Sequence, residues 1–210
     1  MECVLKAREQ IESIWEAIEL CPVDGDAHKR FISAMLFVSF NHCDGIQILV
    51  QKKNFASAYA LVRPLLETSF RAIWLHRCAN EQQIQECMEK DKWKSAWDLV
   101  QEIEAYNGNT PILSNIWSEM RPLMHSYTHG GVQNAFRQLG DGNSVTPNIP
   151  DIEVFQLMQT VGLMSWLILA EVIDLSKNSD QLKLFEELGK GLNQWAFNKS
   201  IQPTANASVD

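Results

Sequence analysis

The chain has 210 residues, 46% of them hydrophobic and 21% charged, with seven tryptophans, and this composition excludes a disordered or low-complexity protein. Its 18 Lys and Arg against 26 Asp and Glu give a net charge of −8, so no overall positive field would attract DNA or RNA, although a local basic pocket stays open. The five cysteines are scattered and odd in number, which argues against a disulfide framework or a zinc finger.

Helical periodicity runs through the first part of the chain. Apolar residues recur at helical spacing over residues 2–20, and Asp26 is placed to cap a second, mostly buried helix over residues 27–51. Residues 55–79 predict a third helix that is apolar nearly all round, is capped by Asn54, and is kinked about one turn before Pro64. We expect this third helix to be central.

Shorter helices follow. Two are predicted over residues 81–90 and 92–106, and Thr110-Pro111 begins another that runs to the break at Gly130-Gly131. A short helix over residues 132–139, a loop over 140–150, and helices over 151–175 and 180–198 complete the chain. The pattern predicts an all-α fold, a single-domain bundle of about seven to nine helices over residues 1–200, with a frayed tail over residues 201–210.

Nothing in this pattern predicts export or membrane insertion. The first 19 residues mix charges throughout, unlike a secretory signal. The longest apolar run, residues 161–170, is much shorter than the roughly 20 residues of a membrane span. We therefore expect a cytoplasmic protein with no membrane partner.

The third helix carries a stripe of arginines and aromatics. At about 100° per residue, the positions within roughly 80° of Arg63 are Tyr59, Leu66, Glu67, Phe70, Arg71, Trp74 and Arg77. Glu67 lies four residues from both Arg63 and Arg71, which favours local ion pairs, and the excess of arginine leaves room for an anionic partner. Two interpretations stay open, a buried ion-pair network that fixes helix register and a pocket for a ligand or substrate.

A histidine segment precedes the double glycine. His125 and His129 lie about 40° apart on one helix face, close to Arg121 and Tyr127. One histidine could act as a general acid or base, or both could bind a metal with Glu67 or Asp44, although Ser126 stands where the zincin pattern needs a glutamate. The structural alternative is that His129 caps a helix end and His125 hydrogen-bonds in the core. Our first choice includes neither a metal nor a cofactor.

Several stretches resemble a group of uncharacterised bacterial helical proteins known only as domains of unknown function. They are residues 55–67 with the Arg-Pro-Leu-x-Glu motif at Arg63, then Arg71 and Trp74-Leu75, then the Tyr-Thr-His-Gly motif at Tyr127 with Gln133 and Arg137. The resemblance covers residues 30–175. That group is similar in architecture to HEPN-like bundles, some of which serve in phage defence or toxin–antitoxin systems.

The resemblance suggests a second catalytic pattern. Arg71 and His76 have the spacing of the catalytic motif in HEPN endoribonucleases, although Ala72 stands where that family usually has a polar residue. In an unbroken helix the two side chains would diverge by about 140°, so a helix break or a partner subunit would be needed to bring them together.

One site hypothesis joins these features. If the third helix packs against the histidine segment, one polar cleft lined by Trp74 and Trp117 would hold the candidate catalytic residues His129, His125, Arg71, Arg63, Glu67 and Tyr127. Histidine would deprotonate a ribose 2′-hydroxyl and arginine would stabilise charge on the phosphate, as in a metal-independent ribonuclease. We expect an RNA or nucleotide substrate, a homodimer and an antitoxin partner. The alternatives are a non-catalytic interaction module whose Arg and His cluster is structural, and a metal-dependent hydrolase using His125 and His129.

Overall fold

In the computed structural model, which describes residues 2–128, 131–140, 142 and 144–198, the regular structure is helical. Ten α-helices, eight of them of seven residues or more, form without a strand in those residues, which confirms the all-α prediction. In chain order they are α1 (Glu2–Glu19), α2 (Ala27–Gln51), α3 (Phe55–Ala60), α4 (Val62–Arg77), α5 (Glu81–Lys90), α6 (Ala96–Tyr106), α7 (Leu113–Thr128), α8 (Val132–Phe136), α9 (Asp151–Ser176) and α10 (Leu182–Leu192).

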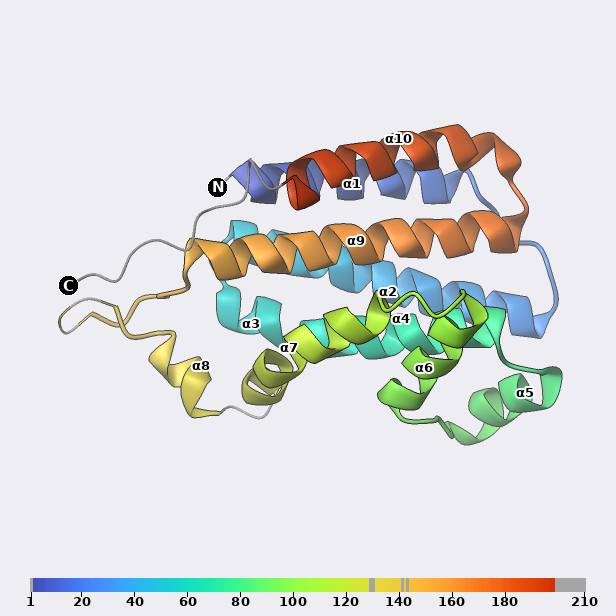
Figure 1. The fold of residues 1–210 in the computed structure, drawn as a ribbon, viewed down its shortest axis with the longest axis horizontal. Coiled ribbons are helices and arrows are strands. Elements are labelled where there is room, and N and C mark those ends of the chain that lie inside the picture. Colours follow the sequence, from blue (N-terminus) through green and yellow to red (C-terminus); the bar gives the residue numbers. More distant parts are fainter. Residues whose placement is uncertain (1, 129–130, 141, 143, 199–210) are drawn as a thin grey trace.

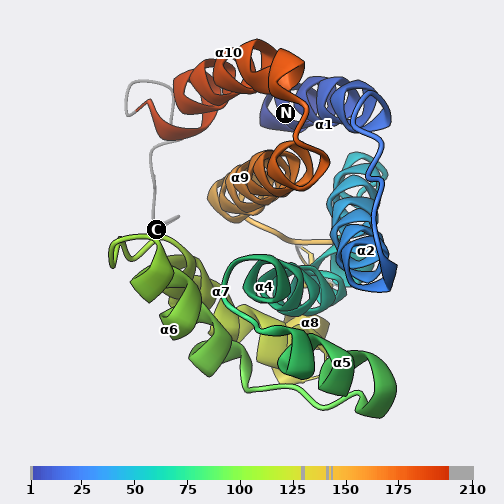
Figure 2. The same ribbon diagram turned by 90° about the vertical axis from the view of Figure 1, so that its right-hand side faces the viewer.

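The long helix α9 forms the axis of the bundle. It packs against α1 and α10 on one side and against α2 and α4 on the other, as Figures 1 and 2 show. By length and composition alone α9 could cross a membrane, but most of its apolar stretch is buried inside the protein. A helix that is apolar nearly all round and buried in this way serves as the core helix of the bundle.

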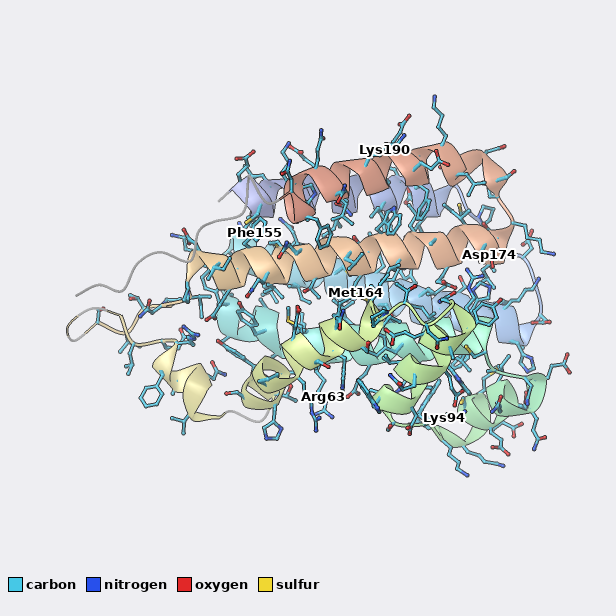
Figure 3. The ribbon with its side chains drawn as sticks, viewed as in Figure 1. Arg63, Lys94, Phe155, Met164, Asp174 and Lys190 are labelled. Atoms are coloured by element: carbon cyan, nitrogen blue, oxygen red, sulfur yellow. The ribbon has the colours of Figure 1, made fainter. Side chains whose placement is uncertain are left out.

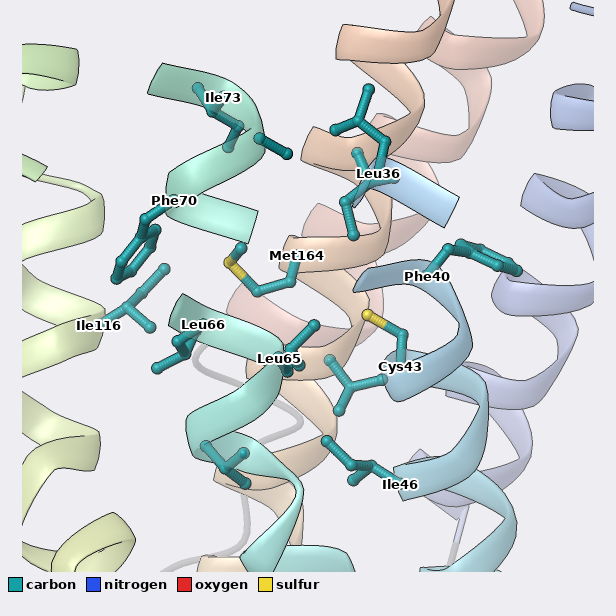
Figure 4. Packing of buried hydrophobic residues seen from close by; sticks show 14 of the residues in the cluster. Leu36, Phe40, Cys43, Ile46, Leu65, Leu66, Phe70, Ile73, Ile116 and Met164 are labelled. Carbon is teal, nitrogen blue, oxygen red and sulfur yellow. The ribbon is translucent and has the colours of Figure 1, made fainter. Parts of the chain in front are cut away.

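Charged side chains lie on the outside of the bundle and apolar ones fill its centre. Figure 3 shows Lys190 at one edge of the molecule and Arg63 and Lys94 at the opposite edge. Between these edges, Met164 of α9 packs beside Leu65 of α4 and Cys43 of α2, all fully buried (Figure 4). The three helices α2, α4 and α9 therefore share one apolar core, which fixes the position of α4.

The third predicted helix is broken just before Pro64. α3 ends at Ala60 and α4 begins at Val62, because proline has no N–H to donate to the carbonyl of Ala60. Leu61, at the end of α3, donates its N–H to the carbonyls of Ser57 and Ala58, at 3.3 and 3.2 Å. The predicted kink is confirmed, and it lets α3 pack against α7 while α4 packs against α2, α6 and α9.

Several predicted boundaries were wrong, each for a local reason. α6 begins at Ala96 and not at residue 92, because the Ser95 side chain accepts a hydrogen bond from the Asp98 N–H and caps the helix there. α8 ends at Phe136 and not at residue 139, because Leu139 forms an antiparallel bridge with Val145.

The last predicted helix, over residues 180–198, is divided. A 3₁₀ turn (Ser179–Gln181) precedes α10, and a π-helical turn (Asn193–Phe197) follows it. The predicted tail over residues 201–210 lies outside the described residues.

Candidate functional site

Two aromatic pairs hold α7 across α3 and α4. Near the end of α7, the ring of Tyr127 stacks on Tyr59 of α3 with 4.7 Å between ring centroids. Near its start, the ring of Trp117 meets Phe70 of α4 edge-on at 5.9 Å. Because Tyr59 precedes Phe70 while Tyr127 follows Trp117, α7 runs antiparallel to α3 and α4, with Arg63 of α4 between the two contacts.

A cavity of about 850 Å³ lies between α4, α7 and the start of α6. This volume is in the range of ligand sites in proteins. Its lining residues are Arg63, Glu67 and Arg71 of α4, Trp117, Arg121, Pro122, Met124 and His125 of α7, and Lys94, Ser95, Ala96, Trp97 and Leu99 around the start of α6. The structure thus brings Arg63, Glu67, Arg71, His125 and Trp117 of the predicted cleft into one cavity.

A single carboxylate is shared by two arginines on the α4 side of this cavity. Arg63 Nε lies 2.7 Å from Glu67 Oε1, and Arg71 Nη2 lies 3.8 Å from Glu67 Oε2. The side chains of Arg63 and Arg71 are 39% and 34% exposed. The ion-pair network is therefore not sealed in the core, and the guanidinium groups can reach a ligand in the cavity.

A third cation, Lys94, is fixed at the edge of the cavity near α6. Lys94 Nζ lies 2.5 and 2.8 Å from the two carboxylate oxygens of Glu102 and 4.8 Å from the ring centroid of Trp74. Burial alone would raise the pKa of Glu102, but hydrogen bonds from Lys94 and from Trp74 Nε1 outweigh this and lower the pKa. Glu102 is therefore ionised at neutral pH and holds the Lys94 ammonium in place.

Not all of the predicted site residues lie in this cavity. Tyr127 is 4% exposed and turned toward Tyr59, and its hydroxyl has no hydrogen-bond partner among the described residues. Burial raises the pKa of this hydroxyl, which disfavours its ionisation. Trp74 is 2% exposed and faces Glu102, while His129 lies outside the described residues.

Arg71 and His76 do not converge within this chain. α4 runs unbroken through both residues, and Arg71 faces the cavity while His76 Nδ1 lies 2.6 Å from Glu171 Oε2 of α9. Arg77 Nε donates to the same carboxylate oxygen at 2.8 Å. The HEPN-like spacing therefore forms no common site inside one copy of the chain.

For the alternative of a metal bound by the two histidines, one of the two carboxylates proposed as the third ligand lies in the cavity. Glu67 lines the cavity, whereas Asp44 lies on α2, where burial and the charge of Glu12 raise its pKa. In the part of the chain that the structure describes, no group of three or more His, Cys, Asp and Glu side chains is arranged to hold a metal ion.

Sequence reasoning missed the contribution of the start of α6. Lys94 and Trp97 line the cavity, but the helix was predicted over residues 92–106, so its true N-terminus between these two residues was not recognised. The signal that could have found this end is Ser95 followed three residues later by Asp98, a pattern of residues that marks helix N-termini.

Comparison with known proteins places the cavity inside a recognised family region. A family model described as a family of unknown function, DUF6988, matches residues 36–193. This range contains every residue that lines the cavity. No curated protein and no solved structure matches the chain.

Proposed function

We propose that this chain, which belongs to the family of unknown function DUF6988, binds a phosphorylated nucleotide between α4, α6 and α7 and processes it there. Membership of such a family was predicted from the Arg-Pro-Leu-x-Glu and Tyr-Thr-His-Gly motifs, and the match confirms it. The observation that carries the functional proposal is a cavity lined by four cations and two tryptophans in a protein of net charge −8.

The charge of the cavity favours an anionic ligand. Its lining contributes Arg63, Arg71, Lys94 and Arg121, and the carboxylates paired with them are Glu67 and Glu102, so four cations face two anions. Arginine binds phosphate through two parallel N–H donors, which makes it the usual residue for this recognition. The first turn of α6 also borders the cavity, and the unsatisfied N–H groups of a helix start add partial positive charge.

The aromatic lining favours a nucleotide over a bare phosphate. Trp97 is 45% exposed and Trp117 is partly buried, and both line the cavity beside the cations. Nucleobases stack on such rings with a stabilisation of about 1–3 kcal/mol per base. Arginines for the phosphate and tryptophans for the base are thus available within one space.

His125 is the candidate for proton transfer. It lines the cavity one helical turn from Arg121, so a proton acceptor and a phosphate-binding cation lie on the same face of α7. In an RNA or oligonucleotide substrate, histidine would take the proton from a ribose 2′-hydroxyl, whose oxygen would attack the phosphorus of the adjacent 3′-phosphodiester. The bond from phosphorus to the 5′-oxygen of the next nucleotide would break, and that oxygen would leave with a proton. His129 is the candidate for the donor of this proton.

The cellular setting follows from the resemblance and not from the cavity. An HEPN-like bundle in a bacterial defence or toxin system would act in the cytoplasm on RNA or nucleotides, as a homodimer, with an antitoxin as partner. In a homodimer, Arg71 of one copy could meet His76 of the other, which a single chain does not allow. A metal-dependent hydrolase that uses His125 and His129 is the third proposal.

The ion pairs of Glu67 with Arg63 and Arg71 favour a second candidate, a non-catalytic interaction module in which this cluster only fixes the helices. Titration calorimetry with AMP separates the two. The nucleotide site predicts that AMP binds and that Arg71→Leu weakens binding about tenfold or more, the loss of one charged hydrogen-bonding group. Arg30→Leu, on an exposed position of α2, is the matched control. No AMP binding by folded protein would favour the interaction module.

Cleavage of total RNA then tests the reaction. The proposed mechanism predicts cleavage that survives EDTA and disappears in His125→Ala while AMP still binds. Cleavage that requires manganese would support the metal-dependent hydrolase, and binding without cleavage would leave a nucleotide-binding protein.

A further inference from the structure

A second, smaller hollow adjoins the large cavity. It has a volume of about 230 Å³ and lies between α5 and the connection to α6, lined by Gln83, Glu86 and Cys87 of α5 and by Lys92 and Trp93 of the connection. Trp74 and Lys94 complete its lining, and Lys94 also lines the large cavity. The two spaces therefore share a wall.

Cations and tryptophans form that shared wall. The guanidinium of Arg71, which lines the large cavity, lies 5.0 Å from the ring centroid of Trp93, which lines the small hollow. Trp93 Nε1 donates to Asp91 Oδ1 at 2.6 Å, which fixes the orientation of this ring. Two positive charges, those of Arg71 and Lys94, thus lie at the junction, with a tryptophan-lined space on either side.

We infer that the ligand of this site is a dinucleotide, with one base in each hollow and the internal phosphodiester at Arg71 and Lys94. This inference rests on the proposed function. A volume of about 230 Å³ is below the roughly 300–1,000 Å³ of an independent ligand site, so the small hollow suits a single flat ring that belongs to a larger ligand. Sites for single-stranded nucleic acid combine cations along the backbone with aromatic rings for successive bases, and this wall has both.

Charge argues for a short ligand and against a long strand. The protein carries a net charge of −8, while the cations proposed to bind the ligand line the cavity and the small hollow. At physiological ionic strength the Debye length is about 8 Å, so a dinucleotide interacts mainly with the cations around it. A long RNA would extend beyond them over an acidic protein, without the salt-dependent gain that phosphate contacts normally give.

The test compares AMP with a dinucleotide of adenosine that carries a 5′-phosphate, pApA, by titration calorimetry; the first ribose of pApA lacks its 2′-hydroxyl, so that the proposed reaction cannot cleave it. The second stacked base predicts that pApA binds at least about tenfold more tightly than AMP. Trp93→Leu should reduce this ratio to about one, because it removes the ring for the second base. If the loss of Trp93 also disturbs Arg71, the affinities for AMP and pApA should fall together, because both nucleotides contact Arg71. The ratio of the two affinities therefore reports the second base alone. Trp15→Leu, a half-buried tryptophan on α1, is the matched control and should keep the ratio.

A variant at an exposed residue tests the same prediction if Trp93→Leu does not fold. Lys92 is exposed and lines only the small hollow, so Lys92→Glu should weaken pApA and spare AMP. Lys183→Glu, on α10, makes the same change in net charge far from the site and should spare both. Equal affinities of the unaltered protein for AMP and pApA would overturn the dinucleotide and leave the proposed function standing. Absence of AMP binding would refute the proposed function itself. Much tighter binding of a 20-nucleotide RNA than of pApA would overturn the dinucleotide and indicate an RNA strand as the ligand.

Discussion

Replacing Glu67 with glutamine should strengthen the binding of an anion in the large cavity. Glu67 is the one carboxylate among the described residues that line the cavity. Glutamine keeps an oxygen that can accept the hydrogen bond from Arg63 Nε, which lies 2.7 Å from Glu67 Oε1. The substitution therefore removes a negative charge next to the ligand and preserves the orientation of Arg63.

The size of this effect follows from Coulomb's law. A phosphate held by Arg63 and Arg71 would lie roughly 7 Å from the Glu67 carboxylate, one guanidinium away. At an effective dielectric constant of about 60 for a site open to water, the repulsion is about 0.8 kcal/mol per unit of ligand charge. For the nearly doubly charged phosphate of AMP this is about 1.6 kcal/mol, so we expect affinity to rise by roughly fivefold to fifteenfold at low salt.

Stability should change little, because the side chains of Arg63 and Glu67 are 39% and 24% exposed. A partly exposed pair of this kind contributes about 0.5 kcal/mol to the free energy of unfolding. Urea unfolding of Glu67→Gln measures this cost. A loss above about 2 kcal/mol would contradict the open-cavity interpretation, since only a buried network would lose so much.

A geometrically equivalent ion pair elsewhere in the chain provides the control. Arg8 Nε lies 2.7 Å from Glu12 Oε1 on α1, also four residues apart and outside the cavity. Titration calorimetry with AMP should show a gain for Glu67→Gln that shrinks as salt is added and no gain for Glu12→Gln. Unchanged or weaker binding by Glu67→Gln, or an equal gain in both variants, would refute the reasoning.

Three further predictions concern groups around the core and the cavity. Glu171→Gln should lower the free energy of unfolding by about 2–4 kcal/mol in urea, because the Glu171 side chain is 11% exposed and accepts a short hydrogen bond from Arg77. Glu102→Gln should lower the free energy of unfolding at neutral pH and leave it unchanged in acid, because Lys94 lowers the pKa of Glu102 in the folded state. The Glu102 carboxylate stabilises the fold fully above its unfolded pKa of 4.5, and this stabilisation is lost as the pH falls through its folded-state pKa. Tyr127→Phe should leave AMP binding and RNA cleavage unchanged and keep or raise the urea midpoint, because it removes a buried hydroxyl that has no partner among the described residues; loss of cleavage would make Tyr127 catalytic after all.

The part of the site that the sequence predicted depends on helical spacing alone. Arg63, Glu67 and Arg71 are four residues apart, so any unbroken helix places them on one face, and their pairing around Glu67 follows. The break near Pro64 is also local, because it depends on one missing N–H. Such features can be predicted from a single sequence since no distant contact decides them.

The rest of the site depends on neighbours that spacing does not identify. Trp74 falls in the same predicted stripe as Arg63, yet its indole turns to Glu102 of α6, 28 residues later. Lys94 reaches the cavity because α6 begins only at Ala96, which leaves Lys94 in the connection. A helical wheel gives the direction of a side chain but not the helix that it meets, so Trp74 was misplaced and Lys94 was missed.

The arrangement of α7 explains why a cavity exists between helices that are otherwise packed. Aromatic pairs attract α7 to α3 and α4 at two points, Tyr127 on Tyr59 and Trp117 on Phe70, separated by about 15 Å at 1.5 Å per residue.

Between these points both helices carry cations, Arg63 on α4 and Arg121 on α7. Closing the gap would bring like charges together and remove their water, and both effects oppose contact. The aromatic pairs attach α7 at two points, and the arginines line the cavity between them. A bound anion would relieve that repulsion directly, and this is the physical reason to expect one there.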